Sequence, residues 1–551
     1  MLVGRLLEFA TKQVNYFGGE TEMIKVLISD KLAKEGIELL KKMGGVEPVV
    51  KTGMSEDELC SVIGEYDGLI IRSDTKVTAK VLEKSGKLKA IARAGVGIDN
   101  VDVPAATRKG IIVMNTPGGN TMSAAEHTMA LILAMARHVV PACNSLRAGQ
   151  WDRKTYMGNQ LNHKVLGVIG LGRIGMAVAK MAKGFDMKVL GYDPLTAPAN
   201  AAAEGVEVTQ DLNKIFKEAD FITVHVPKNE QTVNMISTDQ FNMMKPTVRL
   251  VNCARGGIIN EAALGEALKA KRIAGAALDV FVKEPPEDWW FKEVNNCLVT
   301  PHLGASTEEA QIEVAVEAAE IVVDAIKGGP IRNAVNAPAT GGAVPAMVVQ
   351  YGELARRIGA VISTITSGPV KSVSVEYRGK IAEMPVQSAT TAFSIGLLQP
   401  HFDIPLNIVN VGMMAKERGV SIDVTKNPEA VDVSSSFTAK VVTEKTSRVI
   451  TGTVFGESFM RITEIDGFKV EMTPAGTVVV IFNDDKPGVI GQVGTICGKH
   501  GINIGTMGVG QKSDKQKAVL AFSVDKKPGE AVVRELNDLD FVNEIYVCQL
   551  D

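Results

Sequence analysis

Three residues suited to proton transfer and anion binding follow one another in the middle of the sequence. They are Arg255 in Asn-Cys-Ala-Arg-Gly-Gly, Glu284 in Phe-Val-Lys-Glu-Pro-Pro and His302 in Pro-His-Leu-Gly. Histidine moves protons near neutral pH, a nearby carboxylate orients it and favours its charged form, and an arginine can hold a carboxylate with two bonds. Taken singly, Arg255 could cap a helix, Glu284 could lie in a solvated turn, and His302 could be an ordinary loop histidine. Each ends a predicted strand or follows one, so together they could form one catalytic edge of a parallel sheet.

A glycine-rich turn earlier in the sequence indicates which kind of cofactor this edge of the sheet would use. Residues 170–175 read Gly-Leu-Gly-Arg-Ile-Gly, between an apolar run at 165–169 and a helical pattern at 176–182. In such a turn the first glycine permits the bend, the second lets the backbone approach a pyrophosphate, and the third lets helix and strand pack closely. The pattern predicts a dinucleotide site with contacts from Gly170, Gly172, Arg173, Ile174 and Gly175.

An acidic residue at the end of the next apolar run selects the cofactor. Asp193 follows the run at 188–192, about 18 positions after Gly175, close to the spacing at which a carboxylate binds the adenosine ribose hydroxyls. A carboxylate there repels a 2′-phosphate, and residues 194–197 contain no arginine or lysine that would reverse this. We therefore expect NAD rather than NADP.

Composition argues against several other classes of function. A chain of 551 residues is too long for one core and predicts three or four domains. Its net charge of -3 gives no general attraction to nucleic acid or to an anionic membrane, and no apolar run reaches membrane-spanning length. The six scattered cysteines form no CxxC pair, which argues against a zinc site and against a disulfide framework. Cysteines of this kind are typical of a protein in the reducing cytoplasm. Residues 1–22 are expected to be a poorly ordered extension rather than a targeting segment.

The hydrophobic pattern predicts an α/β fold with parallel sheets for the first part of the chain. Apolar runs alternate with amphipathic segments from residue 24 to about residue 300. Capping boxes that begin at Ser123 and Ser306 predict the starts of two long helices, the second of which returns the chain to the first domain. We expect two doubly wound domains, formed by residues 24–121 plus 305–335 and by residues 122–304.

The composition changes after a linker at 336–342, which is rich in small residues, Pro and Gly. Residues 343–475 are rich in Val, Ser and Thr and predict an α+β domain. Residues 476–551 read strand, helix, two strands, helix and strand, which predicts a βαββαβ, ferredoxin-like unit.

The glycine turn followed by Arg-Gly-Gly, Glu-Pro-Pro and Pro-His resembles the D-isomer-specific 2-hydroxyacid dehydrogenases over about residues 24–335. The resemblance implies a flavodoxin-like substrate domain, a Rossmann NAD domain, and catalytic roles for Arg255, Glu284 and His302. It also implies cofactor contacts that lie beyond the glycine turn. These are Val226, Pro227, Cys253, Ala254, Arg255, Asp279, His302, Gly304 and Ala305.

Within that family, the segments 71–73, 93–102, 116–120 and 151–153 resemble the substrate loops of the branch that oxidises D-3-phosphoglycerate to 3-phosphohydroxypyruvate in serine synthesis. This substrate carries a phosphate and a carboxylate, so it needs several cations. The resemblance implies Arg72 and Arg153 at the phosphate, although either could be an ordinary surface arginine, and Arg255 at the carboxylate. The full implied set is Arg72, Ser73, Gly95, Asn120, Arg153 and Arg255.

The C-terminal segments resemble the intervening domain and the ACT domain of the long form of this branch. The resemblance implies that L-serine binds between two ACT units through Asp485 and Asn503, although both residues also favour plain turns. It further implies a homo-oligomer, most simply a tetramer. The apolar helix at 124–136 could be a dimer face or a core helix.

Two other functions fit the same motifs. One is a different 2-hydroxyacid dehydrogenase, such as a hydroxypyruvate or glyoxylate reductase, which needs fewer cations and usually lacks the C-terminal segments. The other is a non-catalytic adaptor that senses NADH on the same fold. The ACT segment favours an enzyme under feedback control over an adaptor.

Overall fold

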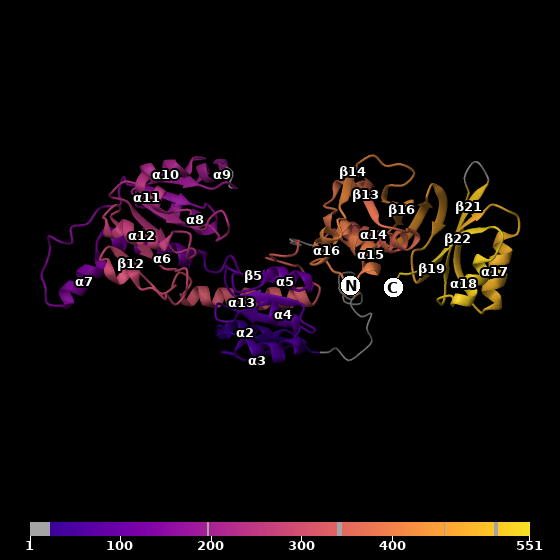
Figure 1. The fold of residues 1–551 in the computed structure, drawn as a ribbon, viewed down its shortest axis with the longest axis horizontal. Helices are drawn as coiled ribbons and strands as arrows, with labels where there is room; N and C mark the ends of the chain where they lie inside the picture. The colour runs from indigo at the N-terminus through magenta and orange to yellow at the C-terminus, as the bar shows by residue number, and fades with distance from the viewer. Residues whose placement is uncertain (1–22, 196–197, 339–343, 457, 512–515, 551) are drawn as a thin grey trace, which may run out of the picture.

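The computed structural model describes residues 23–195, 198–338, 344–456, 458–511 and 516–550. The expectation for residues 1–22 lies outside these ranges. Figure 1 shows two α/β units in the N-terminal part of the chain, joined by the long helix α13, and two β-rich units in the C-terminal part. Among the described residues no single helix is long and apolar enough to span a membrane. Within the described ranges, only the pair α6 and α7, which are bent by 61° relative to each other, has the length and composition of a membrane span when the two helices are taken together.

The first sheet has five parallel strands in the order β2-β1-β3-β4-β5, as in flavodoxin-like folds. Alternate side chains of its strands enter two different cores, because successive residues of a strand face opposite sides of the sheet. Helices α2 and α13 cover one face, and α3, α4 and α5 cover the other. The elements are β1 (Ile24–Ile28), α2 (Lys34–Lys42), β2 (Val46–Val50), α3 (Glu56–Val62), β3 (Gly68–Ile71), α4 (Ala79–Glu83), β4 (Ala90–Arg93), α5 (Val103–Arg108), β5 (Ile112–Asn115) and α13 (Glu308–Ile326).

The second sheet has seven parallel strands in the order β12-β11-β10-β9-β6-β7-β8, which is the Rossmann order with one added strand. Helices α6 and α8 pack on one face, and α10, α11 and α12 pack on the other. The elements are α6 (Thr121–Ala136), α7 (Val139–Arg147), β6 (Val165–Ile169), α8 (Arg173–Lys183), β7 (Lys188–Tyr192), α9 (Pro198–Ala203), β8 (Glu207–Val208), α10 (Leu212–Glu218), β9 (Phe221–Val224), α11 (Thr238–Met243), β10 (Arg249–Asn252), α12 (Glu261–Lys269), β11 (Gly275–Leu278) and β12 (Cys297–Val299).

The two predicted capping boxes are wrong in position. Helix α6 begins at Thr121 after Asn120, and α13 begins at Glu308, where the side chain of Thr307 accepts a bond from the Ala310 N–H. The hydroxyl of Ser123 instead lies 2.6 Å from Thr307 Oγ1. This contact joins the starts of the two helices that connect the α/β units.

The C-terminal half contains a six-stranded sheet in the order β14-β13-β15-β16-β17-β18 and a four-stranded sheet in the order β20-β21-β19-β22. The second sheet has the βαββαβ connectivity expected from the sequence. The elements are α14 (Ala346–Ile365), β13 (Val370–Gly379), α15 (Gln387–Leu398), α16 (Val411–Glu417), β14 (Ile422–Asn427), β15 (Ser435–Thr443), β16 (Ser447–Phe455), β17 (Phe459–Ile465), β18 (Phe468–Met472), β19 (Thr477–Asp484), α17 (Val489–Lys499), β20 (Ile504–Gln511), β21 (Lys517–Val524), α18 (Glu530–Asn537) and β22 (Val542–Gln549).

These two C-terminal sheets share a hydrophobic core. Helices α17 and α18 cover one face of the four-stranded sheet, and Val478, Val480 and Ala521 on its other face pack into the same core as α14 and α15. Strand β18 lies so close to β20 that a Cβ at Gly508 would be 2.5 Å from the carbonyl oxygen of Glu471. The two units are therefore packed together rather than linked by a free tether.

Candidate active site

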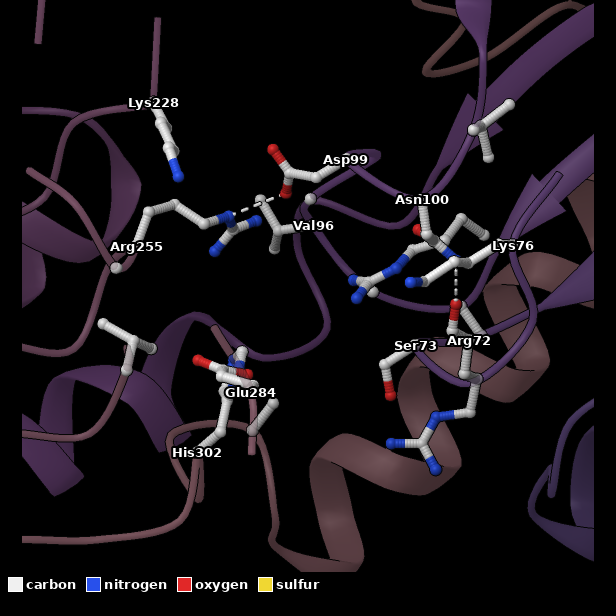
Figure 2. Close-up of a pocket in the computed structure, with 18 of the residues that line it drawn as sticks. Arg72, Ser73, Lys76, Val96, Asp99, Asn100, Lys228, Arg255, Glu284 and His302 are labelled. Carbon is white, nitrogen blue, oxygen red and sulfur yellow. Dashed lines mark hydrogen bonds and ion pairs between the residues drawn. The ribbon is translucent and has the colours of Figure 1, made fainter. Parts of the chain in front are cut away.

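A pocket of about 910 Å³ lies between the two α/β units. The loops after β3 and β4 form one wall, and the loops after β10, β11 and β12 form the other. Figure 2 shows His302, Glu284 and Arg255 on one side, and Arg72, Ser73 and Lys76 on the other. The carboxyl ends of parallel strands thus meet across one cavity, where ligands of open α/β sheets bind.

His302 and Glu284 form a hydrogen-bonded pair in this pocket. Nδ1 of His302 lies 2.6 Å from Oε2 of Glu284, and Oε1 of Glu284 accepts a bond of 3.0 Å from the Phe281 N–H. Burial opposes ionisation of Glu284, but the bonds from His302 and Phe281 outweigh it and lower the pKa of Glu284. A carboxylate that stays charged can orient the imidazole and stabilise its protonated form.

The backbone of His302 is held in an unusual conformation by Asp279. His302 has φ 56, a left-handed conformation that is uncommon outside glycine, and its N–H donates to the Asp279 carbonyl at 2.8 Å. The buried Asp279 carboxylate accepts bonds of 2.8 Å from the N–H groups of Leu303 and Gly304. Several bonds together therefore fix the loop that presents the imidazole.

Asp279 also belongs to a buried cluster with His127 and Cys253, whose ligand-type atoms lie within 4.8 Å of one another. Nε2 of His127 lies 3.2 Å from Asp279 Oδ1, and the Thr300 hydroxyl donates to the same oxygen at 2.6 Å. Burial raises the pKa of the Cys253 thiol to about 12, which keeps it protonated. We interpret this cluster as a hydrogen-bond network rather than a metal site.

Arg255 reaches into the pocket from the loop after β10. The Asn252 side chain fixes this loop by donating to the Arg255 carbonyl at 2.8 Å and by accepting from the Ala254 N–H at 3.0 Å. The guanidinium donates from Nη1 to the Ala254 carbonyl at 2.7 Å and from Nε to Asp99 Oδ2 at 2.9 Å. It is thus held in place and can offer further donors to a bound carboxylate.

The opposite wall of the pocket is strongly cationic. Arg72, Lys76 and Arg93 line it, and Nε of both Arg72 and Arg93 is buried without a hydrogen-bond partner among the described residues. Burial and the nearby guanidinium of Arg255 lower the pKa of Arg93 to about 10. Neighbouring cations that repel one another and have buried, unpaired donor atoms are stabilised by a bound anion.

The glycine turn forms a cradle that fits a dinucleotide. A Cβ at Gly170, where φ is +96, would lie 2.4 Å from the His225 carbonyl, and one at Gly175 would lie 1.9 Å from the Gly170 carbonyl. A Cβ at Gly172 would meet open space, which leaves its backbone accessible at the start of α8. Such a helix start provides N–H donors to a pyrophosphate.

Asp193 lies beside this turn at the end of β7, where its Oδ2 accepts a bond of 2.8 Å from the Leu171 N–H. A carboxylate at this position suits the ribose hydroxyls of NAD and repels a 2′-phosphate. The other implied cofactor residues follow the neighbouring strands. Val226 and Pro227 follow β9, Cys253, Ala254 and Arg255 follow β10, Asp279 follows β11, and His302, Gly304 and Ala305 follow β12.

Comparison with known proteins agrees with this arrangement. Residues 129–304 match the family model for the NAD-binding domain of D-isomer specific 2-hydroxyacid dehydrogenases, residues 347–466 match the D-3-phosphoglycerate dehydrogenase intervening domain, and residues 477–541 match the ACT domain. D-3-phosphoglycerate dehydrogenases from Synechocystis and Archaeoglobus fulgidus are 40% and 41% identical over 96% and 95% of this chain, and over 95% and 100% of their own. The chain belongs to the D-3-phosphoglycerate dehydrogenase family.

Solved structures of other dehydrogenases share the fold of a little more than half of this chain. The D-lactate dehydrogenase from Escherichia coli is 27% identical with a TM-score of 0.51, and a glyoxylate reductase from Paecilomyes thermophila is 26% identical with a TM-score of 0.53. Each match covers 57% of this chain and 100% or 98% of the other. The fold class, the NAD-dependent dehydrogenase family and the ACT domain expected from the sequence are thus confirmed.

The pocket contains most of the implied substrate residues of the family and several that sequence reasoning missed. Arg72, Ser73, Gly95, Asn120 and Arg255 line it, whereas Arg153 lies exposed in the segment after α7 and does not line it. Among the charged lining residues, Lys76 and Lys228 were not expected, and Arg93 and Asp99 lie in the segment 93–102 that resembles a substrate loop but were not singled out. Arg93 ends strand β4, and this position at a strand end was the signal that could have identified it.

Proposed function

We propose that this chain oxidises D-3-phosphoglycerate to 3-phosphohydroxypyruvate with NAD. The supporting observation is a single pocket that has an acid–base pair with an arginine on one wall and a cluster of cations on the other. A substrate with a carboxylate, a C2 hydroxyl and a phosphate matches these groups in order along its length. The match to named relatives over nearly the whole chain supports the same substrate.

In this proposal His302 acts as the base. Its Nδ1 is bound to Glu284, so Nε2 is the nitrogen that accepts the proton of the C2 hydroxyl. Glu284 stabilises the imidazolium that forms, and Arg255 holds the C1 carboxylate and polarises the oxygen at C2. Bound NAD supplies the acceptor for the hydride of C2.

The phosphate binds at the cationic wall in this proposal. Arg72 and Arg93 supply buried donors and Lys76 adds a third positive charge. Arginine forks suit the geometry of a phosphate. This wall distinguishes the proposal from an unphosphorylated substrate such as glyoxylate, because the shared fold alone also fits lactate and glyoxylate enzymes.

A spectrophotometric assay tests the proposed reaction. We expect the chain to oxidise NADH with 3-phosphohydroxypyruvate and to oxidise it far more slowly with glyoxylate or hydroxypyruvate. Equal rates with glyoxylate would favour the reductase alternative. NADH binding without turnover of any of these acids would favour the adaptor.

We further propose that L-serine binds between two ACT units. Asp485 precedes α17 and Asn503 follows it, and a helix of 11 residues is about 16 Å long. Two residues so far apart in one unit cannot hold one serine, whereas Asp485 of one unit and Asn503 of another can. Inhibition of the assay by L-serine, and its loss in D485A and N503A, is the expected result. Inhibition that persists in both variants would exclude this site.

We also propose a homo-oligomer, most simply a tetramer. Helix α6 packs in the core of its own unit, so it is better explained as a core helix than as a dimer face. Several exposed apolar side chains lie on α7 and the segment that follows it. They are Val139, Val140, Leu146, Trp151 and Met157. Exposed apolar side chains of this size favour association with a second copy, and light scattering after size exclusion measures the oligomeric state. The six unpaired cysteines suit a cytoplasmic location.

A further inference from the structure

The carboxylate of Asp99, from one α/β unit, contacts Arg255 of the other unit in the pocket. Asp99 belongs to the loop after β4, and Arg255 belongs to the loop after β10. Nε of Arg255 donates to Oδ2 of Asp99 at 2.9 Å, and Figure 2 shows this bond across the pocket. The side chain of Arg255 is 27% exposed and that of Asp99 is 63% exposed. Asp99 is therefore a solvent-facing partner for a largely covered cation.

The guanidinium of Arg255 is confined on three sides by these contacts. Asp99 binds Nε, the Ala254 carbonyl binds Nη1, and a Cβ at Gly97 would lie 1.7 Å from Nη2. Only a glycine at position 97 leaves room for the guanidinium in this place. The loop of the first unit thus shapes the position of a side chain from the second unit.

The residue after Asp99 ties the same loop to the cationic wall. The side chain amide of Asn100 donates to the carbonyls of Arg72 and Thr75, both at 2.6 Å. One short loop therefore contacts Arg255 through Asp99 and supports the segment that carries Arg72 and Lys76 through Asn100. The spacing between the two ends of the pocket depends on this loop.

We propose that Asp99 is a positioning residue for Arg255. It holds the guanidinium across the boundary between the two units, so that the carboxylate site is complete only when the loop after β4 meets the loop after β10. The inference rests on the proposed function, in which Arg255 binds the substrate carboxylate. A free arginine would lose this preorganisation, because a long flexible side chain samples many rotamers.

The test measures ligand affinity rather than turnover alone. Oxamate, a 2-oxo acid analogue without a phosphate, is titrated by calorimetry into the complex of the full chain with NADH. We expect D99N to weaken oxamate binding about tenfold or more, as for loss of a charge-assisted hydrogen bond, and D99E to recover part of it. The matched control is D74N, which removes an exposed acid near the pocket that does not contact Arg255. We expect it to stay within about twofold.

Repeating the D99N substitution in an R255A variant distinguishes a positioning role of Asp99 from a general structural role. In R255A, the further change D99N should leave oxamate affinity unchanged, because Asp99 then has no guanidinium to place. The KM for NADH should stay constant in D99N while the KM for the oxo acid rises. Tighter oxamate binding in D99N would mean that Asp99 competes with the substrate, and an equal loss in the R255A background would mean a merely structural role. Either result overturns the inference.

Failure of the proposed function gives a different pattern. A wild-type chain that binds oxamate but does not reduce 3-phosphohydroxypyruvate contradicts the substrate assignment, while the effect of D99N on oxamate still supports the Asp99–Arg255 pair. A wild-type NADH complex that does not bind oxamate overturns the carboxylate site at Arg255 and the role of Asp99 together.

Discussion

Oε2 of Glu284 lies 2.6 Å from Nδ1 of His302, across 18 positions of the sequence. The two side chains come from the loops after β11 and β12, which are adjacent parallel strands. Because the Phe281 N–H binds the other oxygen of Glu284, the carboxylate is fixed on both sides. The pair therefore presents the other imidazole nitrogen, Nε2, to the pocket in a fixed orientation.

Removing the base of this pair should slow turnover strongly without preventing cofactor binding. We expect H302A to lower kcat by about 10²- to 10⁴-fold, the usual contribution of a general base. The affinity for NADH, measured by fluorescence, should change by less than about twofold, because the glycine cradle is untouched. E284Q should lower kcat by about tenfold or more through loss of the charge. The control E287Q, at an exposed residue paired with Lys283, should have no effect. Loss of NADH binding in H302A would contradict the assigned role.

The cofactor preference should depend on the carboxylate beside the glycine turn. D193A removes the acceptor of the Leu171 N–H and the charge that repels a 2′-phosphate. We expect the KM for NAD to rise about tenfold and the relative use of NADP to increase, measured as the ratio of the two kcat/KM values. The exposed Glu204 provides the control E204Q. An unchanged ratio in D193A would show that another residue selects the cofactor.

The cofactor half of the site could be predicted from sequence because its constraints are local. The turn at Gly170 and Gly175 needs glycine for steric reasons that act within a few residues, and Asp193 ends the next strand. The strand runs were also predictable, since buried parallel strands are nearly continuous apolar segments. The helix starts were not, because Ser123 bonds to Thr307 at the start of the other helix instead of capping α6, and α13 is capped by Thr307 rather than by Ser306.

The substrate half was less predictable because it depends on contacts between units. Nothing near Asp99 in sequence indicates that it binds Arg255, 156 positions away. Arg93 lies in a segment that resembles a substrate loop, but only the fold, which places the end of β4 at the pocket, shows that this residue lines the site. In the same way, the continuous apolar run of β19 predicts a buried strand but does not show that Val478 and Val480 pack into the same core as α14 and α15.

The cationic wall should determine selectivity for phosphorylated substrates. R93K keeps a positive charge but loses the guanidinium fork, so we expect the KM for 3-phosphohydroxypyruvate to rise about tenfold. The kcat/KM for glyoxylate should change much less, because glyoxylate does not reach this wall. Lys80, whose partner is Asp57 outside the pocket, provides the control K80A. A proportional loss with both substrates would argue against a phosphate site at Arg93.

Acidification should destabilise the loop that carries His302. Burial opposes ionisation of Asp279, but the bonds from His127, Thr300, Leu303 and Gly304 lower its pKa. A carboxyl with a lowered folded-state pKa contributes stability that is fully present above its unfolded pKa of about 3.9 and is lost as the pH falls through the folded value. D279N should therefore lower the thermal midpoint of unfolding at pH 7. Between pH 5 and pH 3, an interval around that unfolded pKa, the thermal midpoint of D279N should fall less than that of the wild type. Equal acid sensitivity of both proteins would contradict this.

Arg448 should hold the ACT unit against the intervening unit. This buried arginine on β16 donates to Asp466 at 2.8 Å, to Glu544 on β22, and to the Ile365 carbonyl at 3.0 Å. Its guanidinium carbon also lies 4.2 Å from the ring centroid of Phe482 on β19. One side chain thus connects both C-terminal sheets.

Replacing this side chain with an apolar one of similar length should therefore loosen the junction. R448M leaves two carboxylates without their cation, and the cost should be about 2–3 kcal/mol, below the value for a fully buried pair because Glu544 is 43% exposed. We expect faster limited proteolysis between β18 and β19 and an earlier first thermal transition. Turnover without L-serine should be unchanged, because the pocket lies in other units. R534M, at an exposed arginine paired with Glu530 on the same helix, should behave as wild type. Unchanged proteolysis in R448M would show that the shared apolar core alone holds the two sheets together.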